Sequence, residues 1–110
     1  MPYKQRTAGK YAVIEWTGDV DLSCTSEARS QVLECLESGQ DLLVDLTAVH
    51  HIDSSAVAVL IEGLQTAKET GLDFGLIGPP RAVLAVLELA HLDQIIPIHA
   101  SIEALVKPGR

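Results

Sequence analysis

The chain begins with short apolar runs of the kind found in β-strands. Residues 11–16 are rich in β-compatible side chains, and residues 3–7 precede them across an Ala-Gly-Lys turn. These two segments predict an N-terminal hairpin whose second strand ends at Gly18. Residues 42–44, Leu-Leu-Val between two aspartates, predict a buried central strand, and residues 46–53 predict a polar connection after it.

Residues 25–39 have the spacing of an amphipathic helix. Thr25 or Ser26 is suited to the N-cap position, and Gly39 is suited to end the helix. Apolar residues recur at spacings of three and four, namely Ala28, Val32 and Leu36, supported by Leu33 and Cys35. We expect this face to pack on the sheet, with Cys35 as a small core residue.

The strongest helical pattern covers Ser54–Thr70. Its apolar stripe consists of Val57, Leu60, Ile61, Leu64 and Ala67. Gly71 lies just beyond the last turn and is suited to stop the helix. We expect the stripe to face Leu43 in the buried strand.

The remaining elements alternate in the same way. Residues 74–77 predict a strand, and a Gly-Pro-Pro turn leads into a helix over Arg81–Leu89. Residues 95–98 predict an edge strand because Pro97 interrupts them, and residues 101–106 predict a terminal helix. This order predicts an α/β fold in a single domain over residues 1–110. Its mixed, largely parallel sheet of four to five strands is packed by about four helices.

The distribution of charge narrows the class of partner. The 110 residues carry a formal net charge of -7, and residues 11–53 hold nine acidic residues against the single base Arg29. Such acidity argues against electrostatic binding to nucleic acid or to an anionic membrane surface. A protein partner is therefore expected.

Cysteine spacing and hydropathy indicate in which cellular compartment the protein is expected. Cys24 and Cys35 have neither the spacing of a CxxC redox pair nor that of a zinc half-site, which favours a reducing cytosol. The longest apolar stretch, residues 56–61, is far too short to span a bilayer, and residues 1–4 lead into no signal-peptide segment. A cytoplasmic protein without membrane insertion is expected.

Candidate chemistry concentrates at the start of the strongest helix, in the segment His-His-Ile-Asp-Ser-Ser-Ala over residues 50–56. In parallel α/β sheets the loops after the strand ends collect ligand and partner contacts. The first turn of a helix also offers unpaired N–H groups and the positive end of the helix dipole. A phosphate group at this position is expected to be stabilised.

The same residues carry a family resemblance. Leu-Leu-Val-Asp-Leu at residues 42–46 and Ile-Asp-Ser-Ser-Ala-Val-Ala-Val-Leu at residues 52–60 resemble the signature of STAS domains, which include the bacterial anti-sigma factor antagonists. Residues 18–21 resemble the acidic turn after that family's N-terminal strand, and residues 71–92 resemble its later strand, turn and helix. The resemblance covers residues 11–106 and agrees with the predicted order of elements.

This resemblance implies a regulatory protein that acts by binding and not as an enzyme. In the antagonists, the serine directly after the aspartate, here Ser54, is phosphorylated by a partner that is both an anti-sigma factor and a serine kinase. The unphosphorylated form binds the anti-sigma factor and frees the sigma factor for transcription, and a phosphatase reverses the modification. The implied contact surface comprises Asp19, Asp21, Asp53, Ser54, Ser55 and Ala56, with no cofactor and no metal.

Two alternatives stay open at this point. Small STAS proteins also serve as cytoplasmic accessory subunits of phospholipid-transport ABC systems, where they bind the permease–ATPase complex through the same surface. Ser54 does not separate the two functions, and it also fits a serine that only caps the helix or contacts a partner unmodified. A hydrolase is a remote third class because Ser54 lacks a GxSxG elbow.

Three further patterns bear on the site. Ala56 and Val57 stand where the family usually has Gly-Leu, and the methyl group of Ala56 is expected to restrict the approach of a kinase loop. His50 and His51 are interpreted as solvated loop residues because two adjacent histidines rarely point to one metal ion. The glycines at residues 71, 75 and 78 form no phosphate-binding pattern, so no nucleotide cofactor is expected.

Overall fold

In the computed structural model, which describes residues 3–105, five strands form one mixed sheet in the order β1-β2-β3-β4-β5. The strands are β1 (Lys4–Ala8), β2 (Tyr11–Val20), β3 (Asp41–Ile52), β4 (Phe74–Ile77) and β5 (Ile98–His99). β1 and β2 are antiparallel, whereas the other neighbouring pairs are parallel. The predicted α/β fold with a mixed, largely parallel sheet is confirmed.

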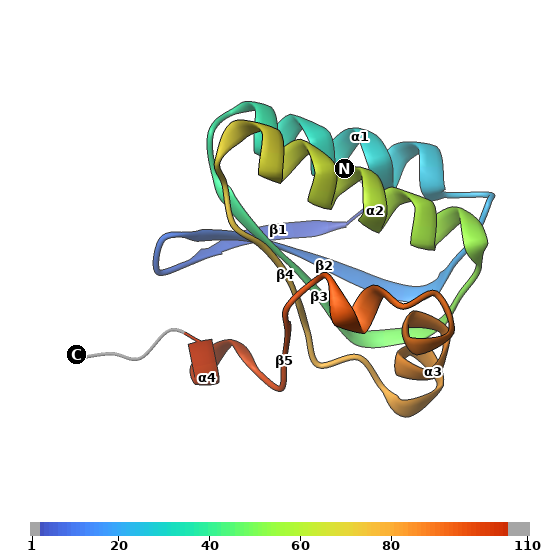
Figure 1. Cartoon of the computed structure of the whole chain (residues 1–110). Coiled ribbons are helices and arrows are strands. Elements are labelled where there is room, and N and C mark those ends of the chain that lie inside the picture. Colours follow the sequence, from blue (N-terminus) through green and yellow to red (C-terminus); the bar gives the residue numbers. More distant parts are fainter. Residues whose placement is uncertain (1–2, 106–110) are drawn as a thin grey trace.

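Two helices, α1 (Thr25–Glu37) and α2 (Ser54–Thr70), lie side by side over one face of the sheet (Figure 1). α3 (Arg81–Leu89) packs against β3 and against the 3-10 turn η1 (Leu92–Gln94). The four-residue helix α4 (Ile102–Leu105) follows β5. Residues 3–105 thus contain three helices of nine or more residues and one short helix, close to the predicted four. Val106, the predicted last residue of the terminal helix, lies outside the described residues.

The main core lies between the sheet and α1 and α2. Its largest fully buried side chains include Trp16, Ile14, Leu42, Leu46 and Leu60. The buried side of α3 belongs to the same core. The strands follow one another across the sheet in chain order, and right-handed crossovers therefore bring successive helices to the same face.

Helix α2 has the predicted bounds. Gly71 ends it in a left-handed conformation with φ of 74°, which glycine adopts without the steric cost that other residues have. Within the predicted apolar stripe, Leu60 and Leu64 are buried, whereas Val57 and Ile61 are half-buried at its margin.

Leu43 is buried as expected, but it lies on the other face of the sheet. Side chains alternate along β3, so Leu42 and Val44 belong to the main core, whereas Leu43 packs with Val13 and Ile77 in a second, smaller cluster. Apolar side chains of α4 pack against that second cluster. The prediction that the stripe of α2 faces Leu43 is therefore wrong.

Strands β2 and β3 continue past their predicted ends. Gly18 was expected to close β2 and residues 46–53 to form a connection, but the strands reach Val20 and Ile52, which pair with each other. The register between the two strands shifts twice, and Gly18 has φ of 69° beside the second shift. Such irregularities interrupt the alternation by which a strand is recognised in a sequence.

The N-cap of α1 also differs from the prediction. The helix begins at Thr25, and its N-cap residue is Cys24 instead of Thr25 or Ser26. The backbone carbonyl of Asp21 accepts hydrogen bonds from the N–H groups of Cys24 and Thr25, at 3.0 and 3.1 Å. A backbone turn thus takes the place of a capping side chain.

The last strand is shorter than predicted. Residues 95–98 were expected to form it, but β5 covers only Ile98–His99 because the chain first closes the turn η1, where the N–H of Ile96 donates to the carbonyl of Leu92. The predicted edge position of this strand is confirmed. The carbonyl of Pro97 accepts from Leu76 N at 2.9 Å, a bond that needs no N–H group on proline.

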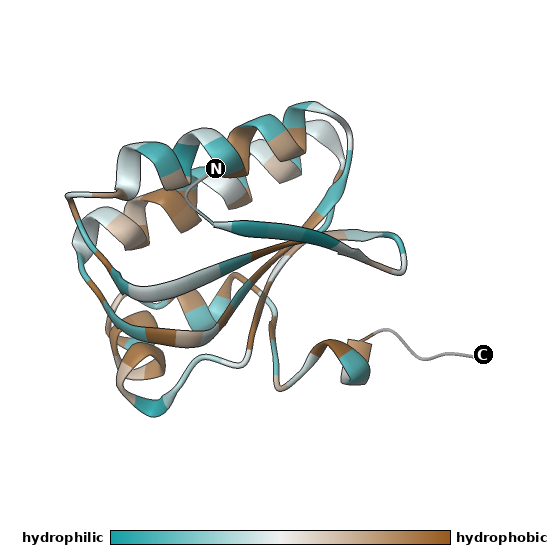
Figure 2. Cartoon of the chain, turned by 180° about the vertical axis from the view of Figure 1, so that it is seen from behind, coloured by the Kyte–Doolittle hydropathy of each residue, from teal (hydrophilic) through white to brown (hydrophobic). Residues whose placement is uncertain are grey.

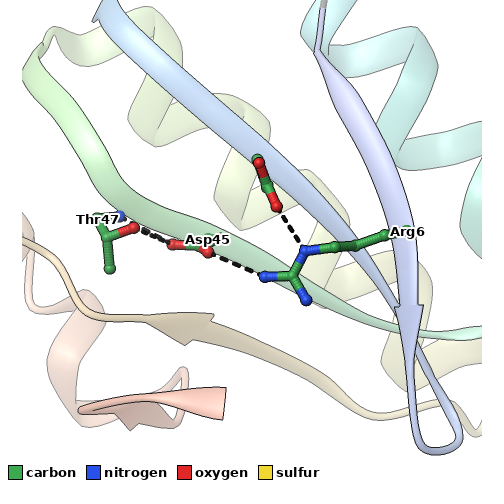
Figure 3. A network of polar contacts seen from close by, with 4 residues as sticks. Arg6, Asp45 and Thr47 are labelled. Carbon is green, nitrogen blue, oxygen red and sulfur yellow. Dashed lines mark hydrogen bonds and ion pairs between the residues drawn. The ribbon is translucent and has the colours of Figure 1, made fainter.

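A polar network crosses the three strands β1, β2 and β3 on the face opposite α1 and α2 (Figure 3). Arg6 forms ion pairs with Glu15 at 2.5 Å and with Asp45 at 3.5 Å. The other carboxylate oxygen of Asp45 accepts from the backbone N–H and the hydroxyl of Thr47. The network connects β1 to β2 and β3 through the side chain of Arg6. Seen from behind, β1 is mainly hydrophilic (Figure 2), which suits an exposed edge strand.

Candidate functional site

Asp53 organises the first turn of α2. As the N-cap residue, it accepts through Oδ1 from Ser55 N at 2.9 Å, Ser55 Oγ at 2.5 Å and Ala56 N at 3.2 Å. Its backbone carbonyl accepts from Val57 N at 3.1 Å. The bonds to Oδ1 satisfy the N–H groups of Ser55 and Ala56, which a helix start otherwise leaves unpaired. The helix is therefore capped by Asp53, and the interpretation of Ser54 as the cap is wrong.

Asp53 also holds the turn between β2 and α1. Its Oδ2 accepts from Leu22 N at 3.2 Å, and its N–H donates to the carbonyl of Val20 at 3.4 Å. The ends of β2 and β3 are neighbours in the sheet, so these two segments, distant in sequence, come together at one end of the molecule. The carboxylate of Asp53 thereby joins two segments of the contact surface that the family resemblance implies.

The acidic turn has its own local contacts. Asp21 Oδ1 accepts from Ser23 N at 3.0 Å and from Ser23 Oγ at 2.6 Å. Asp19 is exposed at the end of β2 and stands opposite His51 in the strand register. Both acids lie in the chain segment that reaches Asp53. The turn is joined to the N-cap residue of α2 through Leu22 N, however, and not through the side chain of Asp21.

The three residues after Asp53 differ in exposure. Ser54 is exposed, Ser55 is half-buried with its hydroxyl donating to Asp53, and Ala56 is completely buried. The methyl group of Ala56 packs into the main core. It presents no exposed atom beside Ser54, and the expectation that it restricts a kinase loop stays a prediction.

The N–H donors at this helix start are already engaged. Two of the N–H groups expected to receive a phosphate, those of Ser55 and Ala56, donate to Asp53 instead. The hydroxyl of Ser55, followed by these N–H groups and that of Leu22, lowers the pKa of Asp53 below its ordinary value of 3.8. A phosphoryl group on Ser54 would therefore meet an ionised carboxylate and donors that are already in use.

Protonation of Asp53 at low pH is expected to weaken its bonds to the β2–α1 turn and to the first turn of α2 together. Because the pKa of Asp53 is lower in the folded chain than in the unfolded one, its carboxylate stabilises the fold at pH values above the ordinary 3.8. That contribution is lost as the pH falls through the lower, folded-state pKa. In ¹⁵N-resolved spectra, the amide signals of Leu22, Ser55 and Ala56 should shift in one common transition. The Asp53→Asn variant should lack it, and separate transitions would contradict the shared contact.

The other predicted features can be placed as well. His50 and His51 are exposed, but they lie on β3 and not in a loop. Over residues 3–105, no group of three His, Cys, Asp or Glu side chains is placed to hold a metal ion. Cys35 is buried, as expected for a core residue, and both cysteines are free. The described part of the chain has no helix with the length and apolar character needed to cross a bilayer.

A pocket of about 230 Å³ lies elsewhere, on the face of the sheet opposite α1 and α2. Tyr11, Leu43 and His99 are among its lining residues, and none of the predicted contact residues lines it. The candidate site is instead an exposed helix start beside an exposed turn. Such a surface is suited to contact with a protein and not to enclosing a small molecule.

Comparison with known proteins gives a consistent result. The family model described as the STAS domain matches residues 3–105. A candidate anti-sigma factor antagonist from Thermotoga maritima has a TM-score of 0.88 and 23% identity, over 98% of this chain and 95% of that one. An anti-sigma-factor antagonist (STAS) domain protein from Planctomyces limnophilus has a TM-score of 0.86 and 20% identity, over 94% of each chain.

Similarity extends to SpoIIAA, a cell fate determinant of Bacillus that is described as an anti-sigma factor antagonist. Its unphosphorylated form has a TM-score of 0.79 and 16% identity, over 94% of this chain and 92% of that one. Its phosphorylated form has a TM-score of 0.73 and 15% identity, over 94% of this chain and 96% of that one. At such identities the likeness to each structure shows the shared fold.

Proposed function

This chain belongs to the STAS domain family, and we propose that it is an anti-sigma factor antagonist that acts through phosphorylation-controlled binding of a protein partner. The observation that carries this proposal is the exposed Ser54 at the start of α2, directly after Asp53. The solved relatives named as anti-sigma factor antagonists support the choice of class. The protein so proposed works in the cytoplasm, without catalysis of its own and without a cofactor or metal.

The partner in this proposal is an anti-sigma factor that is also a serine kinase using ATP. Ser54 Oγ forms a bond to the γ-phosphorus, and the bond from that phosphorus to the oxygen bridging to the β-phosphate breaks. ADP leaves, and the hydroxyl proton passes to a base on the kinase. The unphosphorylated chain binds the partner, the phosphorylated chain does not, and a phosphatase restores the first state.

Local electrostatics explain how such a modification could act without refolding. A phosphoryl group adds roughly -1.5 to -2 charge at pH 7. Asp53 is adjacent, and residues 11–53 already hold nine acids against one base. Because the N–H groups of Ser55 and Ala56 serve Asp53, little donor capacity in this turn is left for the new charge. The added charge therefore lacks donors within this turn, and a partner that covers it must remove its water without compensation.

Replacing Ser54 with aspartate is expected to weaken binding of the partner about 100-fold, because a carboxylate that the partner covers beside Asp53 loses its water without gaining a counter-charge. Ser54→Ala should bind nearly as tightly as the parent and should take up no phosphate. Calorimetric titration with the purified anti-sigma factor kinase of the same organism measures affinity. Mass spectrometry after incubation with ATP locates the phosphate. Both variants should keep the parent's melting temperature, since Ser54 is exposed.

Two outcomes would contradict the proposal. If Ser54→Asp and Ser54→Ala both bind the kinase as tightly as the parent, Ser54 is not at the interface. If affinity purification recovers an ABC permease–ATPase complex and no kinase modifies Ser54, the chain serves a phospholipid-transport system instead.

A further inference from the structure

Large apolar side chains are strongly exposed at three described positions, namely Leu22, Leu89 and Ile95. Leu22 is 78% exposed and differs from the other two in its setting. It stands in the turn between β2 and α1, with Asp21 before it and Ser23 after it. Leu89, which is 83% exposed, is the last residue of α3 and provides a comparison of similar exposure.

The backbone around Leu22 is held from both sides. Leu22 N donates to Asp53 Oδ2 at 3.2 Å, which fixes the residue against the first turn of α2. Asp21 Oδ1 accepts from the N–H and the hydroxyl of Ser23, which closes the turn just after Leu22. An apolar side chain on a fixed backbone loses less conformational freedom when a partner buries it, so it suits the role of an anchor.

We propose that Leu22 is the apolar anchor of the partner-binding surface and that Asp53 is the positioning residue that holds it in place. This inference rests on the proposed function and extends its surface by a residue that sequence patterns did not single out. The occupant is the anti-sigma factor kinase, through an apolar pocket rimmed by lysine or arginine. Acidic Asp19, at the end of β2, and Asp21 precede the anchor and complement such a rim.

The same contacts connect the anchor to modification of Ser54. A phosphoryl group on Ser54 lies one residue from Asp53, where it repels the carboxylate and competes for the N–H groups of Ser55 and Ala56. Either effect displaces Asp53 Oδ2 from Leu22 N. Phosphorylation therefore acts twice, by adding charge beside the partner and by loosening the turn that presents Leu22.

The variant Asp53→Asn separates anchoring from helix capping. Asparagine keeps an oxygen that accepts from Ser55 and Ala56, and it is as good an N-cap residue as aspartate. Its amide nitrogen replaces the oxygen that now accepts from Leu22, and a nitrogen that only donates cannot form that bond. In the free protein, hydrogen exchange of the Leu22 amide should become severalfold faster, whereas exchange at Ser55 should change little.

Affinity for the purified anti-sigma factor kinase tests the proposal. Leu22→Ala should weaken binding at least about tenfold, as loss of an apolar anchor does. The matched control Leu89→Ala should bind as the parent does, and neither change should lower the melting temperature. Asp53→Asn should also weaken binding, and the double variant Leu22→Ala/Asp53→Asn should bind no more weakly than Leu22→Ala, since Asp53 acts through Leu22.

The results that overturn this inference differ from those that overturn the proposed function. If Leu22→Ala binds as the parent while Ser54→Asp loses affinity, Leu22 is not the anchor and the proposed function stands. If Leu89→Ala weakens binding as much as Leu22→Ala, the apolar contact is not specific to this turn. Independent, additive losses in the double variant would refute the positioning role of Asp53. If Leu22→Ala and Ser54→Asp both leave binding unchanged, both proposals fail.

Discussion

Replacing Trp16 with alanine is expected to lower the free energy of unfolding by about 3–5 kcal/mol, the largest loss expected from a single substitution considered for this chain. Trp16 is completely buried on β2 at the centre of the main core. Its ring lies 6.1 Å from the ring of Tyr3, in a tilted arrangement. Alanine would remove the whole indole and leave a cavity that the surrounding sheet and helices cannot fill. Urea unfolding followed by circular dichroism measures the loss.

The variant Trp16→Phe provides the matched control. The buried indole Nε1 has no hydrogen-bond partner among residues 3–105, and phenylalanine removes this donor while keeping an aromatic ring. Because no bond within that part of the chain is lost, Trp16→Phe should cost clearly less than Trp16→Ala. Equal losses from the two variants would contradict the assignment of the loss to the cavity left by the removed ring.

Replacing Leu60 with alanine is expected to cost about 2–5 kcal/mol, from lost burial and from the cavity left behind. Leu60 is completely buried on the face of α2 that packs on the sheet. Trp16 is the only tryptophan of the chain, so its fluorescence reports unfolding in this variant without interference. The midpoint of urea unfolding should fall while the slope of the transition stays constant.

Leu89→Ala tests whether burial causes the loss at Leu60. Leu89 has the same side chain, also on a helix, but it is 83% exposed. Its replacement should change the stability by less than about 0.5 kcal/mol, as is usual for a surface position. A loss of that small size at Leu60 would place Leu60 on the surface and contradict the assignment of the buried face of α2.

Elements defined by local signals were predicted well. The bounds of α2 follow from its apolar spacing and from Gly71, which adopts the left-handed conformation that glycine favours at a helix end. The strand Phe74–Ile77 and the helix Arg81–Leu89 were predicted with their observed bounds, because turn residues separate them. By contrast, β2 and β3 were predicted too short, since two register shifts interrupt their alternation.

Part of the candidate site was also visible in the sequence, and part depends on the tertiary structure. Asp53, Ser54, Ser55 and Ala56 are consecutive, so their motif and the start of α2 are visible in the sequence. The bond that joins Asp53 to Leu22 depends on the parallel pairing of β2 and β3 out to Val20 and Ile52. Leu22 is an ordinary apolar residue in a polar turn, and no local pattern marks it.

The sequence by itself determined the class of fold, the order of its elements and the segment that carries Ser54, because each depends on short-range periodicity or on consecutive residues. Only the tertiary structure decided which face of the sheet each side chain meets. Leu43 lies away from α2 because strand pairing and right-handed crossovers place α1 and α2 on the side of Leu42 and Val44. The same long-range packing buries Ala56 and brings Leu22 to Asp53, contacts between residues whose proximity no sequence spacing encodes.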